Sequence, residues 1–128
     1  MTKVKTKEFV ATLREDGIIH VVVSNNTHIT IDIQVEMVKA YWSLTTIKRP
    51  FIFEAGEFVS ISKEARINAK TIEEETPVLA SALIIKNLAH KILAEYYYKF
   101  NRPKRPLKLF KSIETAEKWL LENFPPEV

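Results

Sequence analysis

Two short runs of β-forming residues near the amino terminus are separated by a turn sequence. Glu8–Arg14 and Ile18–Ser24 are rich in branched and aromatic residues, and Glu15-Asp16-Gly17 lies between them. An Asp-Gly pair between two such runs favours a β-hairpin, because glycine readily adopts the left-handed backbone that tight hairpin turns require. In the second run both alternating faces are mostly apolar, so we expect this strand to be covered on both sides of the sheet.

The next segment has the periodicity of a helix followed by a strand. Apolar residues recur at the spacing of one helix face from Ile33 to Leu44. Asp32 precedes the first of them, and because aspartate is a favoured N-cap, we expect the helix to start there. Phe51–Phe53 then indicates a short buried strand, with Pro50 at its first position, where a missing backbone donor is tolerated.

Between residues 58 and 77 the sequence predicts a second helix, which follows a brief alternation of apolar and polar residues. Phe58–Ile61 alternates briefly between apolar and polar positions, and Ser62 is placed to cap the helix that follows. That helix is expected to end before Pro77, because the residue before a proline disfavours helical backbone. Glu73–Glu75 lies at its carboxyl end, where acidic side chains oppose the helix dipole, so we expect this stretch to fray.

Val78–Ile85 is the best candidate for a central strand. It is continuously apolar apart from Ser81, as in strands that are covered on both faces. Asn87 can cap the helix that follows, and Asn101-Arg102-Pro103 is expected to end it. The apolar stripe of this helix comprises Ala89, Ile92, Leu93, Tyr96, Tyr97 and Phe100.

The last quarter of the chain is a strand joined closely to a helix. Pro106–Phe110 forms the strand, and Ser112 caps a helix that reaches Phe124. Strands that alternate with helices are typical of an α/β sheet. The whole order is β-β-α-β-α-β-α-β-α, which predicts one α/β domain over residues 1–128, with a core at about 9–124 and a mixed, mostly parallel sheet covered by helices.

This element order resembles that of the STAS-like domains. The resemblance rests also on a Leu-Lys-Leu-Phe strand at residues 107–110 and an Ala-Glu-Lys-Trp-Leu segment at residues 116–120. The group contains the anti-sigma-factor antagonists and a branch of uncharacterised bacterial domains related to them, and the similarity covers about Phe9 to Phe124. The resemblance implies an α/β sandwich, a bacterial source and a non-enzymatic role in regulation through protein contacts.

The antagonists also suggest a site of phosphorylation. In them a short strand leads into an Asp-Ser-Ser/Thr-Gly turn at a helix start, where one hydroxyl is phosphorylated by a partner kinase. The matching stretch here is Phe58–Ala65, in which Ser60 and Ser62 stand at about the corresponding place but the aspartate and the glycine are absent. The resemblance therefore makes Ser60 and Ser62 candidate phospho-switch residues, whereas the residues alone favour Ser62 as a simple helix cap.

Composition narrows the chemistry that the chain can perform. Its 128 residues contain no cysteine, which excludes disulfides, thiolate catalysis and cysteine-ligated metals. Two glycines are too few for a loop that cradles phosphate. The first residues show no signal-peptide core, and the apolar runs are shorter than the roughly 20 residues of a membrane span. We therefore expect a cytoplasmic protein that carries no cofactor.

The residues most often used in catalysis are poorly placed for it. The histidines are separated by intervals too long for a metal site: His20, His28 and His90. Ser81 lacks the glycine-flanked elbow of a nucleophilic serine, so we expect a small core residue there. Glu54 and Glu57 are expected on the surface rather than as a catalytic acid pair. The sequence therefore predicts that the protein is not an enzyme and binds no metal.

A run of cations near the carboxyl end is the strongest indication of a binding surface. Lysines and arginines recur within 13 residues without an intervening acid, at Lys99, Arg102, Lys104, Arg105, Lys108 and Lys111. Arginine can bind carboxylate or phosphate through two parallel hydrogen bonds, and lysine adds a point charge. We predict a surface for an anion or an acidic partner at Lys99, Arg102, Lys104 and Arg105, with Tyr98 beside them.

Together these patterns predict a non-catalytic binding or regulatory module that acts through contacts with an unidentified protein partner; homodimerisation stays open on base rates. One alternative is a small domain that holds a lipid or another apolar ligand in a hydrophobic cleft. Another is weak attachment to anionic membranes, to which each cation contributes on the order of 1 kcal/mol. The basic run could also be a solvated rim. Nucleic acid is disfavoured, because exposed aromatic residues do not alternate with the cations.

Overall fold

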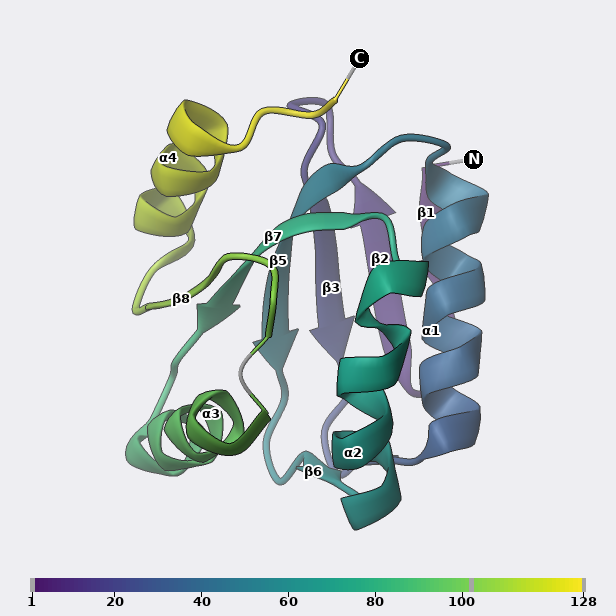
Figure 1. Ribbon diagram of the computed structural model, residues 1–128, viewed down its shortest axis with the longest axis vertical. Coiled ribbons are helices and arrows are strands. Elements are labelled where there is room, and N and C mark those ends of the chain that lie inside the picture. Colours follow the sequence, from purple (N-terminus) through teal and green to yellow (C-terminus); the bar gives the residue numbers. More distant parts are fainter. Residues whose placement is uncertain (1, 102, 128) are drawn as a thin grey trace.

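A six-stranded sheet forms the centre of the molecule. Figure 1 shows this sheet in the computed structural model, which describes residues 2–101 and 103–127. The side chains of residues 93 and 96–101 are not among the described parts. The strand order is β1-β2-β3-β5-β7-β8. The strands are β1 (Lys3–Lys5), β2 (Phe9–Leu13), β3 (Ile19–Val23), β5 (Arg49–Ala55), β7 (Val78–Ile84) and β8 (Leu107–Phe110). β1, β2 and β3 pair antiparallel, and the pairs from β3 to β8 are parallel. The predicted mixed, mostly parallel α/β sheet is therefore confirmed.

The amino-terminal hairpin turns where the sequence places it. β2 pairs with β3 from Phe9↔Val23 to Leu13↔Ile19. Between them Gly17 has a φ of 90°, which is the left-handed region that glycine enters without a steric penalty. The Asp16 carboxylate accepts a hydrogen bond from the backbone N–H of Ile18 at 3.1 Å, which stabilises the turn locally.

Three short strands of the structure are absent from the element order predicted from the sequence. β1 extends the hairpin on its outer side, and β4 (His28–Ile29) pairs in parallel with β6 (Ser60–Ile61) as a separate two-stranded sheet. Segments of two or three residues are too short to show an alternating period. The small sheet nevertheless matters, because it ties together the loops that lead into the first two helices.

Four α-helices connect or follow the strands: α1 (Ile31–Leu44), α2 (Lys63–Ile72), α3 (Leu88–Asn101) and α4 (Ile113–Asn123). Ser62 and Ser112 cap α2 and α4 as predicted, and the Asn87 side chain accepts from the backbone N–H of His90 at the start of α3. The prediction for α1 is wrong by two residues. Its cap is Thr30, and Asp32 lies in the first turn, where its charge favours the helix dipole.

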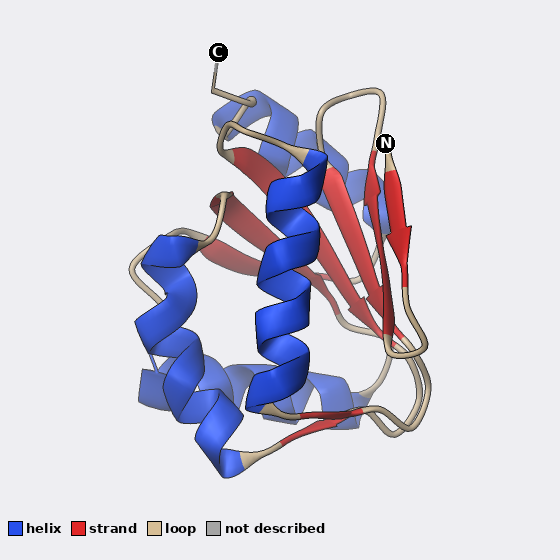
Figure 2. Cartoon of the chain, turned by 90° about the vertical axis from the view of Figure 1, so that its right-hand side faces the viewer, coloured by secondary structure: helices blue, strands red, loops and turns tan. Residues whose placement is uncertain are grey.

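Helices cover both faces of the sheet, and each face has its own apolar core (Figure 2). α1 packs Met37, Tyr41 and Leu44 against β2, β3 and β5. α4 packs Ala116 and Leu120 against β5 and β7 on the opposite face. Neighbouring residues of β5 serve the two cores, because side chains alternate along a strand.

β7 lies inside the sheet but not at its middle. It pairs with β5 on one side and with the edge strand β8 on the other, so the two central strands are β3 and β5. Ala80, Ala82 and Ile84 face α4 and are buried, and the small side chains of Ala80 and Ala82 allow that helix to pack closely on the strand. The strand itself is confirmed, and its register with β8 runs from Ser81↔Leu107 to Ile84↔Phe110.

β3 is not covered on both sides as predicted. Ile19, Val21 and Val23 are buried against α1, but Val22 on the other face is 36% exposed. α4 lies over β5, β7 and β8 and does not extend over β3. This part of the sheet is therefore open on the α4 side, and the apolar pattern of β3 overstates its burial.

The predicted apolar stripe of α3 is also wrong in part. Ala89 is exposed and Ile92 is 58% exposed, whereas Ala94 is buried and His90 is partly buried. The reason is the position of α3, which packs against α2 instead of lying flat on the sheet. Other members of the stripe fall outside the described side chains: Leu93, Tyr96, Tyr97 and Phe100.

Candidate ligand-binding cavity

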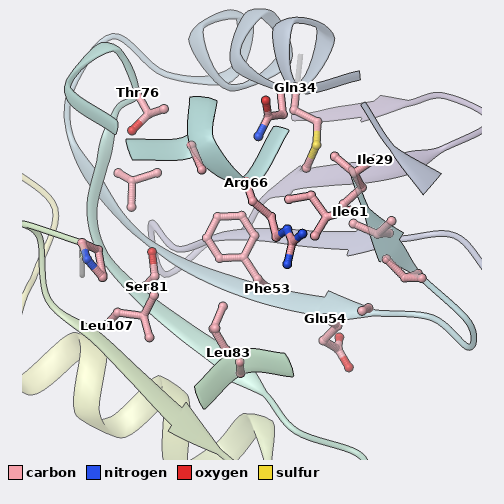
Figure 3. A pocket seen from close by; sticks show the side chains of 18 of the residues that line it. Ile29, Gln34, Phe53, Glu54, Ile61, Arg66, Thr76, Ser81, Leu83 and Leu107 are labelled. Carbon is pink, nitrogen blue, oxygen red and sulfur yellow. The ribbon is translucent and has the colours of Figure 1, made fainter. Parts of the chain in front are cut away.

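A cavity of about 390 Å³ lies on the α1 side of the sheet. Its floor is β5 and β7, and its walls are α1, α2, the start of β8 and α3 (Figure 3). Small side chains at three of these places leave the volume unfilled, because α2 and α3 contact each other above the sheet instead of closing onto it. Those small residues are Ala69 on α2, Ser81 on β7 and Ala94 on α3.

The lining is predominantly apolar. Its larger contributors are Ile29, Met37, Phe53, Ile61, Ile72, Leu83 and Leu107. Tyr41 also lines the space, and burial raises the pKa of its phenol above the ordinary value, so the group stays neutral. Among the alternatives that the sequence left open, the geometry therefore favours a hydrophobic cleft for an apolar ligand, which here lies beneath the second helix.

Two polar side chains in the wall are satisfied within the fold. Gln34 donates from Nε2 to the carbonyl of Ala65 at 2.7 Å and accepts at Oε1 from Nδ2 of Asn68 at 3.0 Å. Thr76 donates from its hydroxyl to the carbonyl of Glu73 at 2.8 Å. These groups therefore stiffen the wall, and they leave the interior of the cavity largely to apolar atoms.

The loop before β8 contributes Pro103 and Arg105 to the cavity lining. Nη1 of Arg105 donates to the carbonyls of Thr76 and Val78, each at 2.8 Å. The Glu73 carboxylate accepts from the backbone N–H groups of Lys104 at 3.2 Å and Arg105 at 2.7 Å. These bonds hold the loop against the segment between α2 and β7, which includes residues of the cavity wall.

The same bonds overturn the predicted fraying at the end of α2. Glu73–Glu75 forms a short 3-10 helix, and the carbonyl of Glu75 accepts from Nε1 of Trp42 at 2.7 Å. The hydrogen bonds from α1 and from the loop before β8 therefore stabilise this stretch by more than the helix dipole destabilises it. Sequence periodicity could not show this, because the partners are some 30 residues away along the chain.

Arg66 brings a cationic group to the cavity wall. It lies in the first half of α2, and Figure 3 shows its side chain extending toward Phe53 and Ile61. Glu54 and Glu73 also contribute to the lining, but their carboxylates have other partners. The sequence did not single out Arg66, yet its guanidinium lies among apolar residues of the cavity wall (Figure 3).

Glu54 is not the surface residue that was expected. Its carboxylate, which is largely buried on the open face of the sheet, pairs with Nε2 of His20 and with Nζ of Lys86, the latter at 3.3 Å. Parallel pairing of β3 with β5 brings His20 and Glu54 to one face, since both point away from α1. Glu57 is exposed, as predicted.

The serines and the remaining histidines have different surroundings, and His90 lies on α3 in the cavity lining. Ser62 Oγ accepts from the backbone N–H of Ala65 at 3.0 Å, which confirms the cap. The exposed Ser60 hydroxyl bonds Nδ1 of His28 at 2.7 Å, and nothing in the structure tests its phosphorylation. Ser81 lines the cavity, while its backbone N–H donates to the carbonyl of Pro106 at 2.9 Å.

The predicted basic surface is described only in part. Lys104 has a side chain that is 71% exposed and reaches Glu74 at 3.1 Å, and Arg105 is directed inward as described above. Lys108 is exposed and its Nζ lies 5.5 Å from the ring centre of Phe110. Tyr98, Lys99 and Arg102 lie outside the described side chains, so the binding role of this segment stays a prediction.

Two features of the described residues bear on metal binding and on membrane insertion. Within residues 2–101 and 103–127, no cluster of three or more histidines and acids could hold a metal ion. None of the helices in that part of the chain is long and apolar enough to span a membrane.

Comparison with known proteins supports the fold and leaves the activity open. The family described as "Domain of unknown function (DUF7793)" matches residues 12–123. A crystal structure of an uncharacterized protein from Shewanella loihica PV-4, of the DUF3478 family and with a SpoIIAA-like fold, matches with a TM-score of 0.63. The two sequences are 14% identical, and the match covers 94% of this chain and 99% of the other. No curated protein matches the sequence. The STAS-like fold predicted from the sequence is thereby confirmed.

Proposed function

The chain belongs to the DUF7793 family of domains of unknown function, and we propose that it is a non-catalytic binding module whose cavity takes a small, predominantly apolar ligand. The observation that carries this proposal is the cavity of about 390 Å³ on the α1 side of the sheet. Its volume falls within the roughly 300–1,000 Å³ of typical small-molecule sites. Its lining comes from elements far apart in the sequence, which the fold must bring together to form it.

The energetic argument is that the lining exposes apolar surface to water. Covering such surface with an apolar ligand contributes roughly 25 cal/mol per Å² that is removed from water. Most of the lining is apolar, so water finds few polar partners there. An apolar ligand would cover this surface, which supports binding as the role of the cavity.

Binding of a neutral probe, 1-dodecanol, tests this proposal directly. We expect the methyl resonances of Met37, Ala69 and Leu83 to shift on titration, because these side chains line the cavity. At a probe concentration one hundred times Kd, the free energy of unfolding should rise by about 2.7 kcal/mol.

Methyl groups on the outer surface provide the control for this titration. Val35 and Ile67 are exposed and lie outside the cavity lining, so their resonances should stay where they are. Shifts spread equally over Val35, Ile67 and the cavity methyls would indicate nonspecific association. An unchanged spectrum and an unchanged stability at saturating 1-dodecanol would overturn the proposal.

Contact with an acidic protein partner through the basic segment is our second proposal. Lys104 and Lys108 are exposed, and Lys108 lies on β8 at the edge of the sheet. Exposed cations raise the rate of association with an acidic surface and make it sensitive to salt. Arg105 is a poor choice for a test, because its bonds to Thr76 and Val78 make its replacement destabilising.

The double variant Lys104→Glu/Lys108→Glu is expected to lose at least tenfold in affinity for a partner identified with the wild-type protein. The change reverses two charges at an interface, where like charges oppose association. Its melting temperature should stay within a few degrees, since both side chains lie on the surface. The variant Lys3→Glu/Lys5→Glu makes the same charge change on β1 at the far edge and serves as the control. Equal affinity of wild type and both variants would end this second proposal.

A further inference from the structure

We infer that the ligand of the cavity is a single-chain amphiphile with one carboxylate, such as a long-chain fatty acid, and that Arg66 binds the carboxylate. This inference rests on the proposed function, because it names the class of ligand that the same cavity selects. It starts from the contrast between the apolar lining and the guanidinium of Arg66 on the cavity wall.

The charges around the cavity favour an anion. Arg66 extends along the wall toward Phe53 and Ile61 (Figure 3). The Glu54 carboxylate is directed to His20 and Lys86, on the other face of the sheet. The Glu73 carboxylate accepts the two backbone N–H groups of the loop before β8. The two acids that contribute to the lining thus have partners elsewhere, and Arg66 and Arg105 are the cationic side chains that the described lining contains.

The hydrogen-bonding capacity of Arg66 is sufficient for a ligand. A guanidinium carries five N–H donors, so it can keep the contact that it makes within the fold and still bind a carboxylate. In an apolar surrounding, a hydrogen bond between two charged groups is considerably stronger than one in water. A carboxylate at Arg66 would therefore gain affinity that a hydroxyl or an alkyl group cannot match.

The count of cations indicates a monoanion rather than a phosphate group. Arg105 also lines the cavity, but its Nη1 donates to the carbonyls of Thr76 and Val78. Arg66 is then the cation best placed to meet a headgroup among the described lining residues. Since one guanidinium matches one carboxylate in a bidentate pair, the rest of the cavity is left for an alkyl chain.

The experiment compares three probes that share one alkyl chain: laurate, 1-dodecanol and dodecylammonium. Affinities are measured by isothermal titration calorimetry below the critical micelle concentration. We expect the wild-type protein to bind laurate at least tenfold more tightly than 1-dodecanol, because the charged pair with Arg66 adds to the same apolar burial. Dodecylammonium should bind least tightly, because its cation meets the cation of Arg66.

Three variants of α2 separate the role of Arg66 from a general effect of charge. Arg66→Gln should bind laurate and 1-dodecanol with equal affinity, and Arg66→Lys should recover part of the preference for laurate. Lys70→Gln removes one positive charge from the same helix at an exposed position outside the cavity, so it should keep the full preference.

The outcomes distinguish the carboxylate inference from the proposed apolar ligand site on which it rests. Tight binding of 1-dodecanol without a preference for laurate, or a preference that survives in Arg66→Gln, would refute the carboxylate inference and leave an apolar ligand site. Failure of all three probes to bind would refute the ligand site itself. Loss of the laurate preference in Lys70→Gln as well as in Arg66→Gln would show that the preference reflects net charge, and this too would overturn the assignment to Arg66.

Discussion

The variant Phe51→Ala is expected to lose about 3–5 kcal/mol of the free energy of unfolding, which is the usual cost of truncating a fully buried phenylalanine. Phe51 has no exposed surface and lies at the centre of the core beneath α1. Its ring meets that of Tyr41 edge-on at 4.9 Å and stacks on that of Phe53 at 5.5 Å. Removing it deletes both aromatic contacts and leaves a void that β3, β5 and α1 cannot close without distortion.

Urea denaturation followed by circular dichroism measures this loss. Phe58→Ala is the matched control, because it makes the same replacement at a phenylalanine that is 81% exposed. Its φ of 57° is strained for phenylalanine and alanine alike, so this variant should stay within about 0.5 kcal/mol of the wild type. A Phe51→Ala protein as stable as Phe58→Ala would show that the core beneath α1 is not packed as described.

The variant Ala69→Trp is expected to abolish binding of laurate and of 1-dodecanol, with at least a hundredfold loss of affinity. Ala69 lies on α2 at the cavity wall, and an indole at this place would occupy volume that the ligand needs. The melting temperature should not fall, because the new side chain fills space rather than displacing packed atoms. Titration calorimetry and thermal unfolding give the two readouts.

Ile67→Trp is the control for this change, because Ile67 is exposed on the same helix and lies outside the cavity lining. It should bind both probes as the wild type does. If Ala69→Trp unfolds, Ala69→Leu supplies a smaller filling group and should weaken binding by about tenfold or more. Unchanged affinity in both Ala69 variants would mean that the ligand site lies elsewhere.

The strand and helix order could be predicted from the sequence because it rests on long apolar runs. Val78–Ile84 shows this well, since its uninterrupted apolar pattern is read without knowledge of its neighbours. Short elements such as β1 and β4 could not be predicted, because two or three residues carry no period. The start of α1 differs from the predicted one for a related reason. Thr30 and Asp32 are both good cap residues, and tertiary packing decides which of them caps the helix.

The sequence left an apolar cleft open as an alternative, but the location and the lining of the cavity could not be predicted from it. Ala69 and Ser81 are small residues, and small residues in a sequence usually indicate close approach of two elements. Here they line a space, because α3 packs on α2 rather than on the sheet. The exposed Ile92 is the other sign of that placement, since an apolar stripe predicts a buried face but not the surface against which it packs.

The two outermost strands of the sheet have a consequence for how the molecules behave at high concentration. Each leaves one row of backbone donors and acceptors unpaired, which is a template for unwanted growth by strand addition. β1 presents Lys3 and Lys5 to solvent, and β8 presents Lys108. Two molecules that approached edge to edge would bring like charges together, so this chain carries its own protection against fibrillar aggregation.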